Sequence, residues 1–270
     1  MKRVRQISCL LLLLIVGASL AANFIAPTDY ATQFRDELPN AKPSHAHLLG
    51  TDDLGRDRFS RVLYGTRVSL LLAPCAALLS TVLAALIGAL AGYLGGWWEK
   101  AAMASADMFL SLPWLFLLLM VRAILPLNVS AFTSVTVTFL LLGLLGWAAS
   151  ARVLCAGARN LRRSDFILLA RATGVGRARL LFLHVLPNLR PILLAQFWMS
   201  IPVFILSEAN LGILGLGVAE PLPSWGSLLR ELEGLANFGG EYWKAIPLVL
   251  LVITVTSFQI VLSRDNEVTA

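Results

Sequence analysis

The chain has 270 residues, of which 57% are hydrophobic and 14% charged, and its mean hydropathy is +0.75. This composition excludes a soluble domain and predicts an integral membrane protein. The net charge of +6 does not indicate nucleic-acid binding, because no basic run is interleaved with aromatic residues and many arginines flank apolar segments, where membrane topology explains them.

A basic start and an uncharged run over residues 7–26 open the chain. Cleaved signal peptides and first membrane helices share this pattern. The run is 20 residues long, which suits a spanning helix, and Asn23 and Phe24 make a poor cleavage site. We therefore expect a retained first transmembrane helix within residues 1–26.

Residues 27–67 are polar and lead into the second apolar segment. Asp52 and Arg56, like Asp57 and Arg61, are acid-before-base pairs at helical spacing, which predicts a short surface helix. The alternative is a metal site, although no diagnostic ligand spacing is present and we expect none. Its ligands would be His47, Asp52, Asp53 and Asp57.

The string HLLGTDDLGRDRFSRVLYGTR within this segment resembles the "HPLGTD..GRD..SR...G.R" segment of ABC importer permeases, in the dipeptide, oligopeptide and nickel branch. In that branch the segment precedes the second helix, and the similarity is to the second permease of the pair. The resemblance implies the type I ABC importer permease fold, with six transmembrane helices and cytoplasmic coupling helices. The positions in register are Gly50, Thr51, Asp52, Gly55, Arg56, Asp57, Ser60, Arg61, Gly65 and Arg67.

Three further apolar segments predict membrane spans over residues 68–94, 101–121 and 129–151. Gly88 and Gly92 lie four apart in the second span, a spacing that permits close helix packing. Asp107 lies near the expected cytoplasmic end of the third span, where a structural or interface role competes with a place in the translocation path.

The loop over residues 152–191 holds eight arginines and one acid. Ser164 and Asp165 predict the start of a short helix, and Gly174 predicts its closure in a left-handed conformation. A second helical run begins at Gly176 and is expected to stop at Pro187. Its apolar surface would be formed by Leu180, Leu181, Leu183 and Val185.

This loop resembles the "EAA…G…LP" motif of the same permeases, which forms the coupling helices that seat in a cleft of a separate ATPase subunit. Leu168 and Leu169 stand where the motif has its glutamate and first alanine. The resemblance implies that the following residues contact the ATPase: Leu168, Leu169, Ala170, Arg171, Ala172, Gly174, Leu186 and Pro187.

The fifth span is predicted over residues 192–218 and the sixth over 245–263. Glu208 would lie near the far interface, as an interfacial acid or as a lining residue of the translocation path. Ser224, Trp225 and Gly226 match the family's "P.PSWG" string in the outer loop 218–244. Asp107, Glu208 and the glycine-lined faces have no evident partner within one chain, so we expect a neighbouring subunit to cover them.

The basic loop costs least on the cytoplasmic side, which places both termini in the cytoplasm and residues 27–67 outside. The sequence lacks a P-loop string and an H-E-x-x-H or G-x-S-x-G motif, so we expect no catalysis, cofactor or metal on this chain. The permease core would cover residues 68–270. A stand-alone secondary transporter or channel is the alternative, and a membrane-bound enzyme is a weaker one.

The resemblance also implies the surroundings of the chain. These would be a bacterial cytoplasmic membrane, a homologous second permease, two P-loop ATPase subunits and an extracytoplasmic substrate-binding protein. The residues do not distinguish peptides from nickel as the solute.

Overall fold

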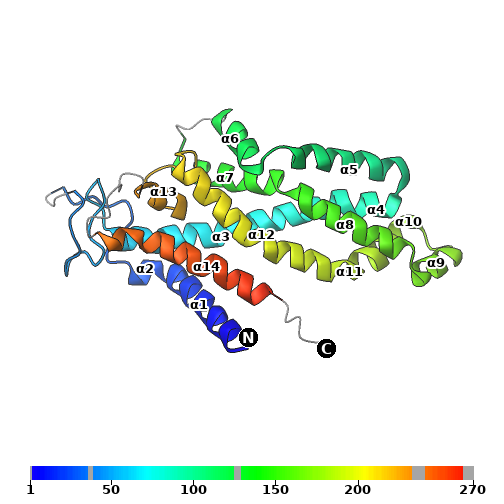
Figure 1. Ribbon diagram of the computed structural model, residues 1–270, viewed down its shortest axis with the longest axis horizontal. Coiled ribbons are helices and arrows are strands. Elements are labelled where there is room, and N and C mark those ends of the chain that lie inside the picture. The colour runs from blue at the N-terminus through cyan, green and yellow to red at the C-terminus, as the bar shows by residue number, and fades with distance from the viewer. Residues whose placement is uncertain (1, 36–38, 125–128, 233–240, 264–270) are drawn as a thin grey trace. The chain divides into compact units, whose positions relative to one another are not determined.

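The computed structural model describes residues 2–35, 39–124, 129–232 and 241–263, and these are largely helical (Figure 1). The only extended pairings in these ranges are two isolated β-bridges. The predicted all-α class is therefore confirmed. The longer elements are α1 (Lys2–Leu20), α3 (Arg58–Ala84), α5 (Gly96–Ser111), α6 (Trp114–Ile124), α7 (Ala131–Leu145), α8 (Trp147–Arg162), α12 (Arg190–Ile213) and α14 (Ile246–Leu262).

Shorter elements join or extend these helices. The π-helical segment η1 (Ala85–Ala89) and α4 (Leu90–Leu94) continue α3, and the 3-10 helix η3 (Tyr242–Ala245) leads into α14. The remaining elements are α2 (Ala22–Ile25), α9 (Asp165–Ala172), α10 (Arg177–Leu180), the π-helical η2 (Leu181–Val185), α11 (Leu186–Asn188) and α13 (Trp225–Arg230).

Five helices in the described part of the chain are long and apolar enough to cross a membrane. They are Lys2–Leu20, Arg58–Leu94, Ala131–Arg162, Arg190–Ile213 and Tyr242–Leu262. A sixth span results if the bent pair α5 and α6 is counted as one. The six apolar segments predicted from the sequence therefore each correspond to one of these helices or to the bent pair. The predicted turn at residues 125–128 and the tail after 263 lie outside the described residues.

The third predicted span, 101–121, is not one straight helix. Its two halves, α5 and α6, meet at an angle of 85°. Pro113 disfavours helical backbone at the residue before it, and Leu112 accordingly is extended, with ψ of 136°. The sequence contained this signal, since Pro113 stands in the middle of the apolar run.

The described chain divides into two compact units. Unit 1 comprises Met1–Ala73, Arg122–Phe139 and Pro202–Ala270, and unit 2 comprises Pro74–Val121 and Leu140–Ile201. In unit 1, α1 packs along α14. Arg67 of α3 secures the end of α1, because its guanidinium donates to the carbonyl oxygens of Ser19 and Leu20, each at 2.8 Å.

In unit 2, α8 packs against η1, α4 and α5 around a core of small and apolar side chains. A side chain at Gly88 would overlap the carbonyl oxygen of Ala151, and one at Gly92 would overlap that of Cys155. The glycines thus allow close approach of α8 within the same chain. The expectation that the glycine face of the second span needs a neighbouring subunit is wrong.

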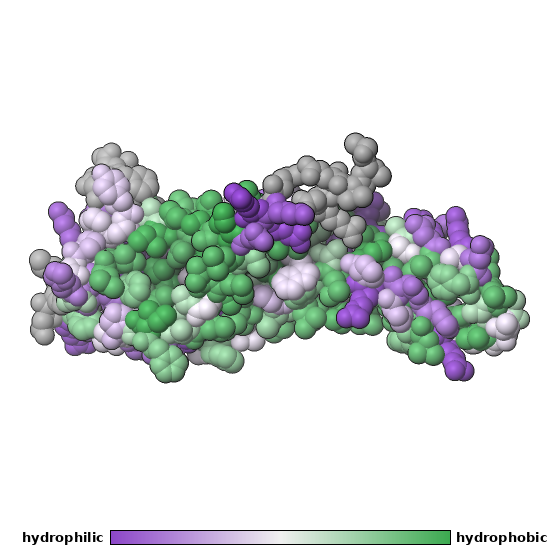
Figure 2. Space-filling view, turned by 90° about the horizontal axis from the view of Figure 1, so that it is seen from below, coloured by the Kyte–Doolittle hydropathy of each residue, from purple (hydrophilic) through white to green (hydrophobic). Residues whose placement is uncertain are grey.

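The surfaces of the spanning helices are mostly apolar in Figure 2. Hydrophilic side chains gather at several places in Figure 2, one of which is the end of unit 2 that carries α9 and α10 in Figure 1. The apolar surface along the helices is typical of helices that face lipid.

Candidate functional sites: the loop helices and the motif cluster

The loop helices, residues 165–188, follow directly on α8, which continues to Arg162 beyond the predicted end at residue 151. Two partners in unit 2 accommodate the charged end of α8. Arg159 pairs with Glu99 at 3.0 Å, and Arg162 donates to the carbonyl oxygen of Leu94 at 3.1 Å. The loop predicted over 152–191 therefore begins as a membrane-helix extension.

Helix α9 starts after Ser164, as predicted, and Asp165 occupies its first turn. The Ser164 hydroxyl does not cap the helix, because it donates back to the carbonyl oxygen of Leu161 at 2.5 Å. The acid in the first turn still favours the helix start through the macrodipole.

Gly174 closes α9 in the left-handed conformation, with φ of +82°, which confirms the prediction. Its N–H donates to the carbonyl oxygen of Arg171 at 3.1 Å, and that of Val175 donates to Ala170 at 3.2 Å. These bonds satisfy the last carbonyl groups of the helix. The turn then leads through Gly176 into α10.

Pro187 does not end the second helical run, contrary to the prediction. After α10 and η2, Pro187 occupies a first-turn position of α11, where a helix needs no backbone N–H. The backbone stays helical to Asn188, and α12 starts at Arg190. The loop helices are thus held close to the beginning of the fifth span.

The loop helices have a buried side and an exposed apolar side. Ile167, Leu180, Leu181 and Val185 belong to the core of unit 2, whereas Leu183, expected on the same apolar surface, is exposed. Phe166, Leu168 and Leu169 of α9 are exposed, Leu169 by 67%. Of the remaining motif positions, Ala170 and Leu186 are half-buried, and Arg171, Ala172 and Pro187 are exposed.

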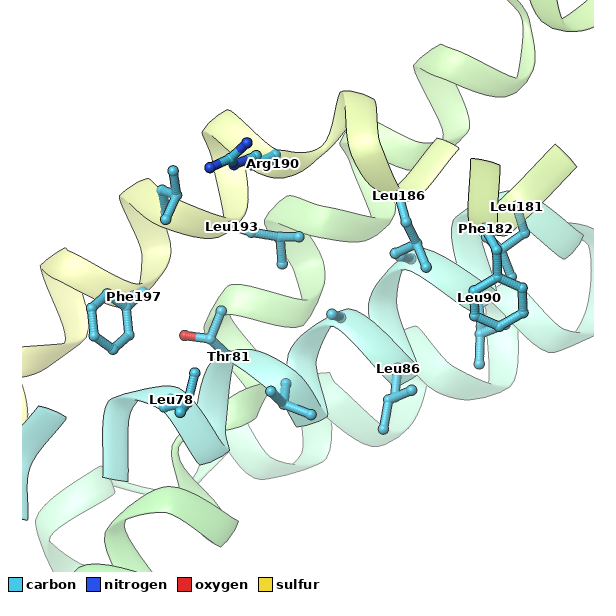
Figure 3. Close-up of a pocket in the computed structure, with 14 residues that line it drawn as sticks. Leu78, Thr81, Leu86, Leu90, Leu181, Phe182, Leu186, Arg190, Leu193 and Phe197 are labelled. Carbon is cyan, nitrogen blue, oxygen red and sulfur yellow. The ribbon is translucent and has the colours of Figure 1, made fainter. Parts of the chain in front are cut away.

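An apolar groove of about 470 Å³ lies beneath the second half of the loop. Leu181, Phe182 and Leu186 line it together with side chains of α12 and of the continuous helix formed by α3, η1 and α4 (Figure 3). The motif residue Leu186 therefore faces a groove that the second and fifth spans also line. The spacing of the motif gave no indication of this position.

Asp107 finds a partner within unit 2. Its carboxylate lies 3.2 Å from the guanidinium of Arg152, and both side chains are more than half exposed. An exposed pair of this kind stabilises little by itself. A place for Asp107 in the translocation path remains a prediction.

Glu208 of α12 is fully buried in unit 1. It accepts hydrogen bonds from the hydroxyl of Ser224, at 2.6 Å, and from that of Ser69, at 3.4 Å. Gly226 packs so closely that a Cβ there would meet the backbone and carboxylate oxygens of Glu208. Glu208 thus anchors the PSWG turn to α12, and the expectation that it lacks a partner within one chain is wrong.

Trp225 completes this anchor. Its side chain is fully buried, and its indole N–H donates to the hydroxyl of Thr66 at 3.0 Å. The hydroxyls of Ser224 and Ser227 form a capping box at the start of α13. The PSWG string, residues 223–226, therefore packs directly against the first half of α3.

The first string, residues 47–67, packs against the same turn, and we call the two strings together the motif cluster. Gly50 and Gly55 have φ of +70° and +73°, which explains glycine at both positions. Thr51 accepts from the backbone N–H of Ala41 at 2.9 Å. Asp57 caps α3, because its carboxylate accepts from the N–H of Ser60 at 2.7 Å, and it also lies 2.8 Å from Nδ1 of His47.

Ion pairs made by buried arginines hold the motif cluster together, although one of their partners, Glu220, is 51% exposed. Arg56 lies 2.6 Å from Asp52 and 2.6 Å from Glu220. Arg61 lies 3.0 Å from Glu220 and 3.3 Å from Asp52, and it does not pair with Asp57. Arg58 pairs with Glu231. The predicted pair of Asp52 and Arg56 thus exists, but it lies before the helix, because α3 begins only at Arg58. The predicted pair of Asp57 and Arg61 is wrong.

The two glutamates of the cluster respond differently to burial. Burial opposes the charged form of Glu220, but the neighbouring Arg61 and Arg56 outweigh it and lower the pKa of this carboxyl. For Glu231 burial outweighs the attraction of Arg58 and Arg61, and its pKa is raised. Glu220 therefore stabilises the cluster chiefly in its ionised form.

The metal alternative finds no support in these contacts. Asp52 is engaged by two arginines, and Asp57 by a helix N-terminus and His47. Within the described ranges no three or more histidines, cysteines or acids group as metal ligands would.

Comparison with known proteins assigns the family. Residues 84–265 match the family described as binding-protein-dependent transport system inner membrane component. The chain is 36% identical to a protein of Brucella suis named as a peptide permease protein, over 80% of this chain and 71% of that one. It is 30% identical to the oligopeptide transport system permease protein of Bacillus subtilis, over 96% and 82%. It is also 34% identical to the glutathione transport system permease protein of Pectobacterium atrosepticum, over 82% and 72%.

The match includes α9, Gly174, Glu208 and the PSWG turn, whose geometry is described above. The helices that can cross a membrane agree with an inner membrane component. The chain therefore belongs to the family of binding-protein-dependent transport system inner membrane components, and it is a permease subunit of an ABC importer.

Proposed function

We propose that this permease carries peptides or peptide-like solutes and forms one half of their path across a bacterial cytoplasmic membrane. The other half would come from a homologous permease, and a binding protein would deliver the solute from outside. The names of the relatives support this solute class, since they specify peptide, oligopeptide and glutathione transport. None of these names supports nickel.

The chain would itself be non-catalytic, and two P-loop ATPase subunits would supply the energy. Both termini and the loop helices would lie in the cytoplasm, with the motif cluster outside. The eight arginines in residues 152–191 support this orientation.

The exposed apolar face of α9 is the observation that carries the coupling role. Phe166, Leu168 and Leu169 are exposed on a short helix fixed to the core by Ile167. Contiguous exposed apolar side chains beside arginines typically mark a protein interface. Since Leu168 replaces the family's glutamate, the facing cleft of the ATPase would be apolar at this point.

Leu168→Glu tests this role. The carboxylate would be buried without a partner in an apolar cleft, so we expect the ATPase subunits to be lost on co-purification with the permease. Leu48→Glu is the matched control. Leu48 is exposed by 56% and Leu168 by 48%, and Leu48 lies in the motif cluster, which is proposed to lie on the side of the membrane away from the ATPase. Retention of the ATPase by Leu168→Glu would show that the cleft keeps a basic partner and would refute the apolar contact.

A further inference from the structure

A polar pocket of about 350 Å³ lies in unit 2, separate from the apolar groove. Arg162, Arg171 and Arg177 line it together with Tyr93 and Leu94. The arginines come from three segments: the end of α8, the end of α9 and the start of α10. The closure of α9 at Gly174 therefore brings Arg171 and Arg177 to one pocket, although they lie on different helices.

The positive charge of this pocket is not compensated within the described chain. No acidic side chain there forms an ion pair with any of the three arginines, whereas the neighbouring Arg152 and Arg159 are both paired. Among the described residues, Arg162 donates to the backbone carbonyls of Leu94 and Tyr93. The hydroxyl of Tyr93 is buried and has no hydrogen-bond partner among the described residues. Buried polar groups are normally satisfied, so a ligand with acceptor oxygens suits this pocket.

The end of a membrane span lines part of the pocket. Tyr93 and Leu94 are the last two residues of the helix Arg58–Leu94, and the highly exposed Trp97 and Trp98 follow after two glycines. Exposed tryptophans at a span end are typical of the interface where lipid headgroups lie. Basic pockets between helix ends at this depth suit anionic headgroups.

We propose that this pocket binds a phosphate group, supplied by the headgroup of an anionic phospholipid or by a soluble phosphate. Guanidinium groups bind phosphate oxygens through charge-assisted, often bidentate hydrogen bonds, and three of them suit one such anion. The bound group would link the ends of α8 and α9 to the start of α10. The orientation of the chain does not affect this proposal, because lipid headgroups occur on both sides of the membrane. Arg171 also belongs to the loop proposed to contact the ATPase, so binding is measured on the chain without the ATPase subunits.

Binding measurements on the full chain in a neutral detergent test the proposal. One arm titrates short-chain phosphatidylglycerol against phosphatidylcholine of the same chain length, with native mass spectrometry as the readout. The other compares inorganic phosphate with chloride at equal ionic strength, with thermal stability as the readout. Arg162 stays unchanged in all variants, since it also caps α4.

The variant pair separates a built site from general charge. Arg171→Gln with Arg177→Gln removes two lining residues, while Arg163→Gln with Arg179→Gln removes two exposed arginines of the same region that do not line the pocket. We expect the first pair to weaken binding by about tenfold or more, and the second to leave it close to the original.

Each outcome is decisive. A specific effect with phosphatidylglycerol identifies a lipid headgroup, and one with inorganic phosphate alone identifies a soluble phosphate. Equal losses in both variant pairs would overturn the site, as would binding that does not distinguish phosphate from phosphatidylcholine and chloride. The site would also be overturned if Arg171→Gln with Arg177→Gln kept phosphate and lipid binding but lost the ATPase subunits on co-purification. The arginines would then bind a carboxylate of the ATPase instead.

Discussion

Gly174 is the residue on which the backbone of the loop helices depends most directly. Its φ is +82°, and among the described residues, its own chain neighbours apart, no atom lies within 4 Å of where a Cβ would stand. A β-branched residue therefore meets only conformational strain, about 1–2 kcal/mol, or shifts the turn. We predict that Gly174→Val leaves membrane insertion and pairing with the second permease intact, while transport and stimulated ATP hydrolysis are lost.

Gly176 provides the matched control for this change. It lies two residues further on, also in open space, but its φ of −62° is accessible to any residue. Gly176→Val should transport normally. An unchanged transport rate in Gly174→Val would show that transport does not require the left-handed conformation at residue 174.

Glu220 gives the motif cluster a defined pH dependence. Its pKa is lowered in the folded protein, so its ionised form contributes stability above the ordinary pKa of about 4.3, and this is lost as the pH falls through the lowered value. We predict that Glu220→Gln lowers the Tm of the purified protein at pH 7, that the difference shrinks as the pH falls below the ordinary pKa, and that it disappears only below the lowered pKa. A difference that persists unchanged in acid would contradict the role of its charge.

Individual residues show where sequence reasoning was sufficient. Gly174 was predictable because a left-handed turn favours glycine on local grounds alone. The partner of Arg61 was not, because Glu220 lies far along the chain and reaches it only through folding. Helical spacing predicted Asp57 for Arg61, but Asp57 caps α3 instead.

At the level of elements, the contact between η1 and α8 leaves no room for a larger side chain at Gly88. A Cβ at Gly88 would overlap the carbonyl oxygen of Ala151, and backbone cannot yield as a side chain does. We predict that Gly88→Ala destabilises the protein by about 1–3 kcal/mol, measured as a lower Tm in detergent. Gly17 in α1 has no atom of the described residues beyond its own helix within 4 Å of its Cβ position, so Gly17→Ala should be neutral or slightly stabilising. Equal Tm values for both variants would contradict the close packing at Gly88.

The ends of elements were the least predictable feature. The uncharged run of the fourth span ended before Arg152, yet α8 continues to Arg162, and the side chains of Arg159 and Arg162 find partners in unit 2. Pro187 was read as a helix end, but its position in the first turn of α11 makes its missing N–H harmless. At the end of the fourth span, contacts from elsewhere in the fold outweigh the charge of the arginines. At residue 187, the position of the proline within the helix makes it compatible with helical backbone.

For the molecule as a whole, the orientation in the membrane is the first prediction to test. Single cysteines at Ser44 and Ser164, in a background without the native cysteines, should differ in reaction with an impermeant maleimide in intact cells. Ser44 should react and Ser164 should not, because residues 27–67 are expected outside and the loop helices inside. The reverse pattern would refute the orientation.

The general architecture followed from hydropathy, since each apolar segment of about 20 residues corresponds to a spanning helix or to the bent pair. The joining of the two strings into one motif cluster did not follow. Residues 47–67 and the PSWG turn are far apart in sequence, and their contact rests on ion pairs and on the buried Trp225. Neither periodicity nor composition records such pairings.

Transport by the reconstituted assembly tests the central claim most directly. Proteoliposomes would contain this chain, its partner permease and the ATPase subunits, with the binding protein and a labelled peptide added. The account predicts that uptake requires ATP and the binding protein and stops when the ATPase subunits are omitted. Peptide uptake by this chain alone, driven by an ion gradient, would contradict it and establish a secondary transporter instead.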